Sequence, residues 1–233
     1  MKQLWLNLFF AASLFHLFGV VTTNTTLLYC TKPLLMPMLA VWLIMATNHR
    51  GEYTFLRRAV MGALVFSTLG DVLLMFSGQI YFLLGLVFFL LAHLFYIGTF
   101  TSISSFKSGF LSRNPWWILP FIIFPVVLLV FLWNGIPMGM KLPVAAYASV
   151  ITGMALSVVN LKGKLAGAIF GSMLAGALLF LSSDSLLATS MFGQPFEGSR
   201  LAIILTYILG QYLLVRGVVG VLKKDNTENS SFR

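Results

Sequence analysis

Charged residues are scarce in this sequence. Lys, Arg, Asp and Glu make up 9% of the 233 residues, whereas hydrophobic residues make up 59%. Because a soluble domain carries about a quarter charged residues, this composition excludes an ordinary soluble protein and indicates an integral membrane protein. No polar stretch is long enough for a second domain. We therefore predict a single transmembrane domain over residues 1–222 and a polar, disordered tail over residues 223–233.

Cysteine is rarer still, and the basic residues are scattered. The single cysteine, Cys30, excludes an internal disulfide and offers no metal cluster. The net charge is +9, but the basic residues stand singly or in pairs beside apolar segments, without a basic run that carries stacking aromatic residues. This distribution argues against nucleic acid as a partner. It is typical of charges that orient a membrane protein.

Long apolar segments are abundant by contrast. A membrane-spanning helix needs about 20 mostly apolar residues. We predict an all-α integral membrane protein, a bundle of eight transmembrane helices at residues 4–21, 27–46, 59–76, 80–100, 116–133, 142–160, 165–189 and 201–222. The first segment is followed by a poor signal-peptide cleavage site, so we interpret it as a helix that is retained. Three glycines, Gly85, Gly171 and Gly176, are predicted to let helices approach closely.

The positive charges predict the orientation of this bundle. If the N-terminus is cytoplasmic, eleven of the 15 Lys and Arg residues lie on the cytoplasmic side. Lys141 and Arg200 lie outside, and Lys32 and Arg216 lie within spans. This asymmetry places both termini in the cytoplasm. We expect the location to be the inner (plasma) membrane of a bacterium.

Two of the six acidic residues, Asp71 and Asp184, lie within apolar segments. Each begins the same short phrase, Asp-x-Leu-Leu, in the third and seventh predicted spans. An aspartate in hydrocarbon costs about 3 kcal/mol on insertion scales, so it is a functional candidate by default. At ~1.5 Å of rise per residue, both lie roughly 7 Å below the outer end of their helices. The plainer alternative is a buried polar network that fixes helix packing.

Further polar residues accompany the two aspartates. Lys32, Tyr147 and Tyr207 are predicted to lie at the same depth on three other helices, whereas His93 and Tyr96 share a deeper face of the fourth. We take six residues as substrate-binding candidates: Lys32, His93, Tyr96, Tyr147, Tyr207 and Gln211. Lys32 could instead extend its ammonium to the interface, and His93 could be a core histidine with satisfied hydrogen bonds. Two prolines, Pro33 and Pro37, are expected to break the second helix beside Lys32.

Two carboxyl groups in one dry cavity cannot easily both ionise. The expected outcome is a protonated acid beside an ionised base, which is the arrangement that acid–base hydrolysis needs. Lys32 could pair with the charged member or hold a phosphate as a point charge. Tyr147 and Tyr207 could donate hydrogen bonds to bound water or to an ester oxygen.

With these residues the sequence resembles the YhhN family of lysoplasmalogenases. The shared pattern covers nearly the whole chain: Lys32-Pro33, Gly70-Asp71-Val72-Leu73-Leu74, Phe82-x-x-Gly85-Leu86, Phe89-Leu90-Leu91-Ala92-His93-Leu94-Phe95-Tyr96, Gly176-x-x-x-Phe180 and Ser183-Asp184. The resemblance implies about eight membrane helices. It also implies cleavage of the vinyl-ether bond of a lysoplasmalogen, with an ethanolamine or choline headgroup, to a fatty aldehyde and a glycerophospho-alcohol.

The implied reaction agrees with the residues. A vinyl ether hydrolyses by protonation on carbon, after which water adds to the oxocarbenium ion and the hemiacetal collapses. One aspartate could deliver the proton while the other stabilises the cation and activates water, so no metal and no organic cofactor are expected. We favour Asp184 as the acid, Asp71 as the base and Lys32 as the phosphate ligand. The expected partners are a lysophospholipid, water and the bilayer.

Two other classes of protein remain open. An intramembrane aspartyl protease also places aspartates on two membrane helices, but its Gly-x-Gly-Asp phrase is absent, since Thr68-Leu69-Gly70-Asp71 has Thr in the first position. A proton-coupled transporter could use the same carboxyls as a relay, and the repeated Asp-x-Leu-Leu phrase mildly favours it. A transporter would move its substrate without consuming it.

Overall fold

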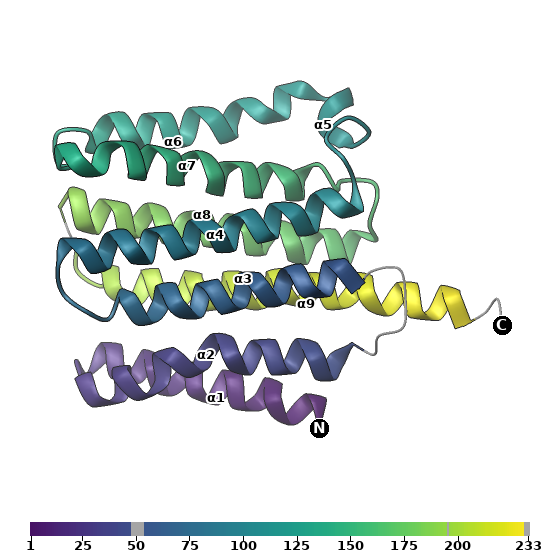
Figure 1. Ribbon diagram of the computed structural model, residues 1–233, viewed down its shortest axis with the longest axis horizontal. Coiled ribbons are helices and arrows are strands. Elements are labelled where there is room, and N and C mark those ends of the chain that lie inside the picture. Colours follow the sequence, from purple (N-terminus) through teal and green to yellow (C-terminus); the bar gives the residue numbers. More distant parts are fainter. Residues whose placement is uncertain (48–53, 195, 231–233) are drawn as a thin grey trace.

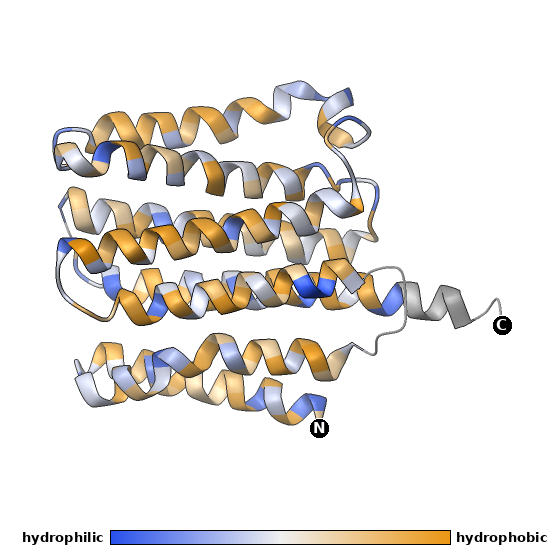
Figure 2. Cartoon of the chain, in the orientation of Figure 1, coloured by the Kyte–Doolittle hydropathy of each residue, from blue (hydrophilic) through white to orange (hydrophobic). Residues whose placement is uncertain are grey.

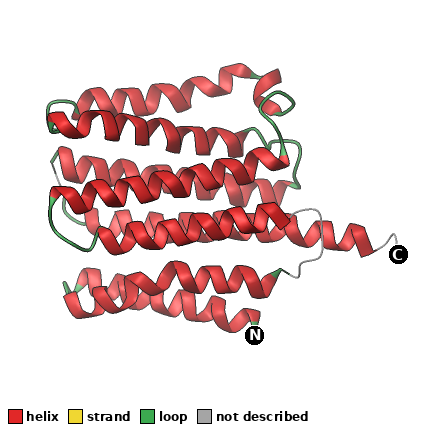
Figure 3. Ribbon diagram, viewed as in Figure 1, coloured by secondary structure: helices red, strands yellow, loops and turns green. Residues whose placement is uncertain are grey.

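The computed structural model describes residues 1–47, 54–194 and 196–230, with side chains as far as residue 224. Within these ranges the chain consists of helices and loops without strands (Figure 3). The long helices lie side by side with their axes roughly aligned (Figure 1). The elements are α1 (Lys2–Val21), α2 (Thr25–Ala46), α3 (Thr54–Leu73), α4 (Gln79–Ile103), α5 (Phe110–Arg113), the 3₁₀ helix η1 (Pro115–Ile118), α6 (Leu119–Leu132), α7 (Met138–Val159), α8 (Gly167–Phe192) and α9 (Ser199–Ser230).

The described helices form a multi-pass membrane protein. Seven of them are long and apolar enough to cross a membrane, with η1 and α6 counted as one span over Pro115–Leu132. Hydrophobic colour covers most of each helix, and hydrophilic colour gathers mainly at the ends of the bundle (Figure 2). The remaining long helix, α3, carries Arg57, Arg58 and Asp71 and is not among the seven. Eight crossings therefore stay a prediction.

The N-terminus and the C-terminal end of α9 lie at the same end of the bundle (Figure 1), as an even number of crossings requires. Their cytoplasmic location stays a prediction. α9 continues through Ser230, eight residues beyond the predicted end of the last span, so residues 223–230 are helical where the sequence predicts a disordered tail. Residues 231–233 lie outside the described residues, and the division into one membrane domain and a tail stays a prediction.

The helices pack around α4 and α9. α9 contacts α8, α1, α2 and α3, whereas α4 contacts α3 and α7. α6 lies at the edge of the bundle, where it packs mainly on α7 (Figure 1). The space between α2, α3, α4, α7, α8 and α9 therefore lies inside the bundle, away from α1 and α6. The candidate site described below is in this space.

Small residues set the closest helix contacts. A Cβ atom at Gly176 of α8 would lie 2.7 Å from the backbone nitrogen of Leu214 on α9, and one at Gly85 would lie 2.8 Å from the Leu74 side chain. Both positions confirm the prediction of close approach. The prediction for Gly171 is wrong, because nothing lies within 4 Å of a Cβ built there. Close approach depends on which way a glycine faces, and its sequence position does not encode that direction.

α2 runs without interruption through Pro33 and Pro37. The prediction that these prolines break the helix is therefore wrong. Each proline removes one backbone N–H donor, and membrane helices tolerate this loss where neighbouring helices pack against the segment. Lys32 consequently projects from a continuous helix.

Candidate active site

Asp71 lies in the interior of the bundle, near the end of α3, where it is 2% exposed. The ammonium nitrogen of Lys32 on α2 lies 3.8 Å from its Oδ1 atom. The hydroxyl of Tyr207 on α9 donates a 2.7 Å hydrogen bond to its Oδ2 atom. Three helices therefore supply a carboxyl, a cation and a hydroxyl to one point, and each oxygen of Asp71 has its own polar partner.

A chain of hydrogen bonds extends from this point across the bundle. The side-chain amide of Gln211, one turn after Tyr207 on α9, donates to the hydroxyl of Ser67 at 3.0 Å and to that of Tyr207 at 3.5 Å. The hydroxyl of Tyr96 on α4 donates to the carbonyl oxygen of the same amide at 2.7 Å. All four side chains are buried. Because each of these side chains has a hydrogen-bond partner, the network fixes the rotamer of Tyr207, the tyrosine that donates to Asp71.

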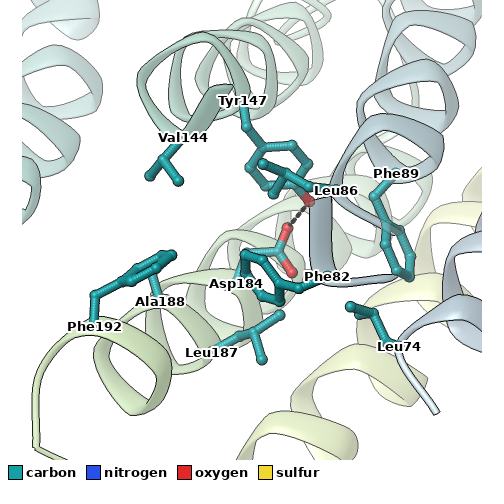
Figure 4. Close-up of a pocket in the computed structure, with 10 residues that line it drawn as sticks. All are labelled: Leu74, Phe82, Leu86, Phe89, Val144, Tyr147, Asp184, Leu187, Ala188 and Phe192. Atoms are coloured by element: carbon teal, nitrogen blue, oxygen red, sulfur yellow. Dashed lines mark hydrogen bonds between the residues drawn. The ribbon is translucent and has the colours of Figure 1, made fainter. Parts of the chain in front are cut away.

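Asp184 lies on α8 in different surroundings. The hydroxyl of Tyr147 on α7 donates a hydrogen bond to its Oδ2 atom, and its other oxygen points away from that tyrosine into an apolar cavity (Figure 4). The cavity is lined by Leu74, Phe82, Leu86, Phe89, Val144, Tyr147, Asp184, Leu187, Ala188 and Phe192. Its volume of about 40 Å³ accommodates water but not a lipid chain.

The two aspartates belong to one site. Asp71 and Asp184 share neighbouring side chains. Phe89 lines the cavity beside Asp184 and packs edge-on against Tyr207, with ring centroids 5.8 Å apart. Leu74, three residues after Asp71, lines the same cavity. The site thus consists of two Asp–Tyr pairs separated by aromatic and aliphatic side chains.

His93 lies beside the second of these pairs. Its ring meets Tyr147 edge-on, with centroids 5.4 Å apart, and its Nδ1 atom lies 2.7 Å from the carbonyl oxygen of Phe89. Since a carbonyl can only accept, Nδ1 carries the proton and Nε2 is the bare nitrogen. Nε2 is buried without a hydrogen-bond partner among the described residues. His93 therefore contacts the site directly, although its polar groups are only half satisfied.

The structure brings all eight sequence-predicted residues to this region. Lys32, Tyr207 and Gln211 gather around Asp71, whereas Tyr147 and His93 gather around Asp184. Their catalytic and binding roles stay predictions. Sequence reasoning missed Ser67, which lies one helical turn before Asp71 and so shares its face, a spacing that could have revealed it. Across the described residues, no group of three His, Cys, Asp or Glu side chains is placed to hold a metal ion.

The fold and these contacts define a class, a multi-pass helical membrane protein with an acidic site inside its bundle. The sequence model described as YhhN family matches residues 27–218, and the chain belongs to this family. The family resemblance carried by the sequence motifs is thereby confirmed.

The chain is similar to several mammalian proteins. Lysoplasmalogenase TMEM86B of Homo sapiens is 35% identical over 164 residues, which cover 70% of this chain and 63% of the human protein. Lysoplasmalogenase TMEM86B of Mus musculus is 30% identical over 216 residues, with 91% and 84% covered. Lysoplasmalogenase TMEM86A of Bos taurus is 27% identical over 194 residues, with 79% and 75% covered. The chain thus spans less than two thirds of the human relative. No solved structure matches it.

Proposed function

We propose that this protein is a lysoplasmalogenase-like hydrolase that cleaves the vinyl-ether bond of a lysoplasmalogen with two intramembrane aspartates. The names of the relatives support the substrate class. The observation that carries the proposal is the contrast between the two carboxyls in one site. Asp71 has a cation at 3.8 Å, whereas Asp184 faces an apolar cavity with one oxygen held by Tyr147. In a pair of carboxyls, different surroundings keep one protonated as the acid and the other ionised as the base.

In the proposed first step, Asp184 is the acid. Tyr147 occupies Oδ2 as a hydrogen-bond donor, so the transferable proton sits on Oδ1, the oxygen that points into the cavity. This proton passes to the vinyl carbon that does not carry the ether oxygen. The π electrons form the new C–H bond, the other vinyl carbon and the ether oxygen share the positive charge, and Asp184 becomes a carboxylate.

In the second step, Asp71 is the base. Its negative charge stabilises the oxocarbenium ion, and it accepts a proton from the water that adds to the cationic carbon. The hemiacetal then collapses, with Asp184 taking its hydroxyl proton and Asp71 returning a proton to the departing glycerol oxygen. The products are a fatty aldehyde and a glycerophospho-alcohol, and both aspartates return to their initial states.

The cavity indicates how the substrate reaches this pair. Its side chains are apolar apart from Asp184 and Tyr147, which suits an alkenyl chain. Because its volume is about 40 Å³, the lining helices must separate before a chain can enter from the bilayer. We propose an ethanolamine or choline headgroup at the outer face, cytoplasmic termini and a bacterial inner membrane as the setting, with no metal or organic cofactor.

The test is release of fatty aldehyde from a defined lysoplasmalogen by purified protein in detergent. Wild type is compared with Asp71→Asn and Asp184→Asn, each of which keeps the side-chain shape, and with Glu197→Gln as an exposed control. A parallel wild-type reaction contains a chelator. We expect aldehyde from wild type and Glu197→Gln, a loss of at least about 100-fold in each aspartate variant, and no chelator effect.

The alternatives give different results. Loss of activity with chelator would contradict the metal-free mechanism. Folded wild-type protein that yields no aldehyde would overturn the substrate assignment, and transport assays with the same variants would then follow.

A further inference from the structure

We propose that Lys141 binds the phosphate of the lysolipid and thereby sets the preference of the enzyme for phosphate-bearing substrates. The inference rests on the proposed function, since it adds a headgroup subsite to the same site. A vinyl-ether lipid carries its reactive bond close to a phosphate, with only the glycerol carbons between them. The acid that protonates the vinyl group should therefore have a cation nearby, on the side where the headgroup lies.

Lys141 lies on α7, three residues before Val144, which lines the cavity. It is in the first turn of α7, and its ammonium nitrogen lies 4.7 Å from the ring centroid of Trp133, directly after α6. Its neighbours Met140 and Val144 are buried in a cluster with Leu132, and this cluster packs against the side chains that line the cavity. The ammonium is thus carried by the helix that forms one wall of the cavity.

The depth of Lys141 suits a headgroup ligand. Tyr147, which donates to Asp184, lies six residues further along α7, or about 9 Å deeper in the bundle. Lys141 is therefore nearer the membrane surface than the proposed acid. A lysolipid keeps its polar head at the interface and its chain in the hydrocarbon. Its phosphate therefore lies nearer the membrane surface than its vinyl ether, just as Lys141 lies nearer the surface than Asp184.

Lys141 and Lys32 differ in the groups that contact their ammonium nitrogens. Lys32 lies beside the carboxylate of Asp71, so its charge is already used to hold the proposed base. Lys141 contacts an aromatic ring instead and has no carboxylate partner among the described residues. A lysine ammonium in a cation–π contact can move to bind a phosphate without breaking an ion pair. The sequence favours Lys32 for the phosphate, whereas the geometry points to Lys141.

The experiment compares two substrates that share a vinyl ether. One is an ethanolamine lysoplasmalogen, and the other is the corresponding alkenylglycerol, which lacks the phosphate. We expect Lys141→Met to raise KM for the lysoplasmalogen about 10-fold, which corresponds to the loss of one charged hydrogen bond, and to leave KM for the alkenylglycerol unchanged. Lys141→Arg should restore the preference. Arg200→Met, which removes an exposed cation at the same end of the bundle, is the matched control.

A binding measurement keeps this inference separate from the proposed reaction. An alkyl-ether lysophospholipid and the matching alkylglycerol cannot be cleaved, so their affinities are measurable whether or not aldehyde is released. Weaker binding of the phospholipid alone to Lys141→Met supports the inference even if the proposed function fails. Equal losses for both lipids, no loss for either, or a phosphate-specific loss in Lys32→Met or Arg200→Met instead would overturn it.

Discussion

The ion pair between Lys32 and Asp71 offers the sharpest test of the site. The perturbation is a double-mutant cycle of Lys32→Met, Asp71→Asn and the combined variant. Methionine keeps an unbranched side chain that fills the space of the lysine stem. Asparagine keeps an oxygen that can accept the hydrogen bond from Tyr207, so the cycle isolates the charges.

The geometry bounds the size of the coupling. Two unit charges about 4 Å apart attract by ~4 kcal/mol at an effective dielectric constant of about 20. The nitrogen-to-oxygen distance here is 3.8 Å, but the Lys32 side chain is 18% exposed and can extend away from an uncharged partner. We therefore expect a coupling free energy of about 1 to 3 kcal/mol. Lys32→Met should be the most destabilised variant, because it leaves Asp71 buried without its cation.

The assay is reversible unfolding in mixed detergent micelles, followed by the fluorescence of the five tryptophans. Adding Asp71→Asn to Lys32→Met should cost little further stability or restore some of it. Lys107→Met, at the opposite end of the bundle, is the control and should add independently to Asp71→Asn. Additive losses for Lys32 and Asp71, within about 0.3 kcal/mol, would refute a charge interaction between them.

Two further predictions use matched pairs of residues. Tyr147→Phe removes the hydroxyl that donates to Asp184 and should lower kcat for aldehyde release at least tenfold, because hydrogen bonds to charged groups contribute about 1.5 to 3 kcal/mol. Tyr29→Phe, which removes a hydroxyl at the bundle surface, should leave kcat unchanged, and equal effects of the two would contradict the role of Tyr147. Gly176→Val places side-chain atoms where a Cβ is already 2.7 Å from a backbone nitrogen of α9, so thermal unfolding in detergent should shift to lower temperature or folded protein should be lost. Gly171→Val, on the same helix, meets open space and should leave the unfolding temperature nearly unchanged.

The class of the protein and its two acidic residues follow from sequence alone. A membrane helix is recognised from the hydropathy of about 20 residues taken together. Its prediction therefore holds even when the predicted ends are wrong by a few residues. An aspartate in such a segment is costly wherever its side chain points, which is why Asp71 and Asp184 could be singled out without a structure. Depth also follows from the sequence, because the rise per residue is constant along a helix.

Partner choice required the tertiary structure. Tyr147 and Tyr207 are predicted at the same depth, and only the packing assigns the first to Asp184 and the second to Asp71. Lys32 could equally have turned to the interface or to a phosphate, and the packing of α2 against α3 brings it to Asp71. Each residue advances a helix by about 100°, so the direction of a side chain depends on how the whole helix is rotated in the bundle. That rotation is set by contacts with the other helices, as at Gly176, and no single segment of the sequence contains it.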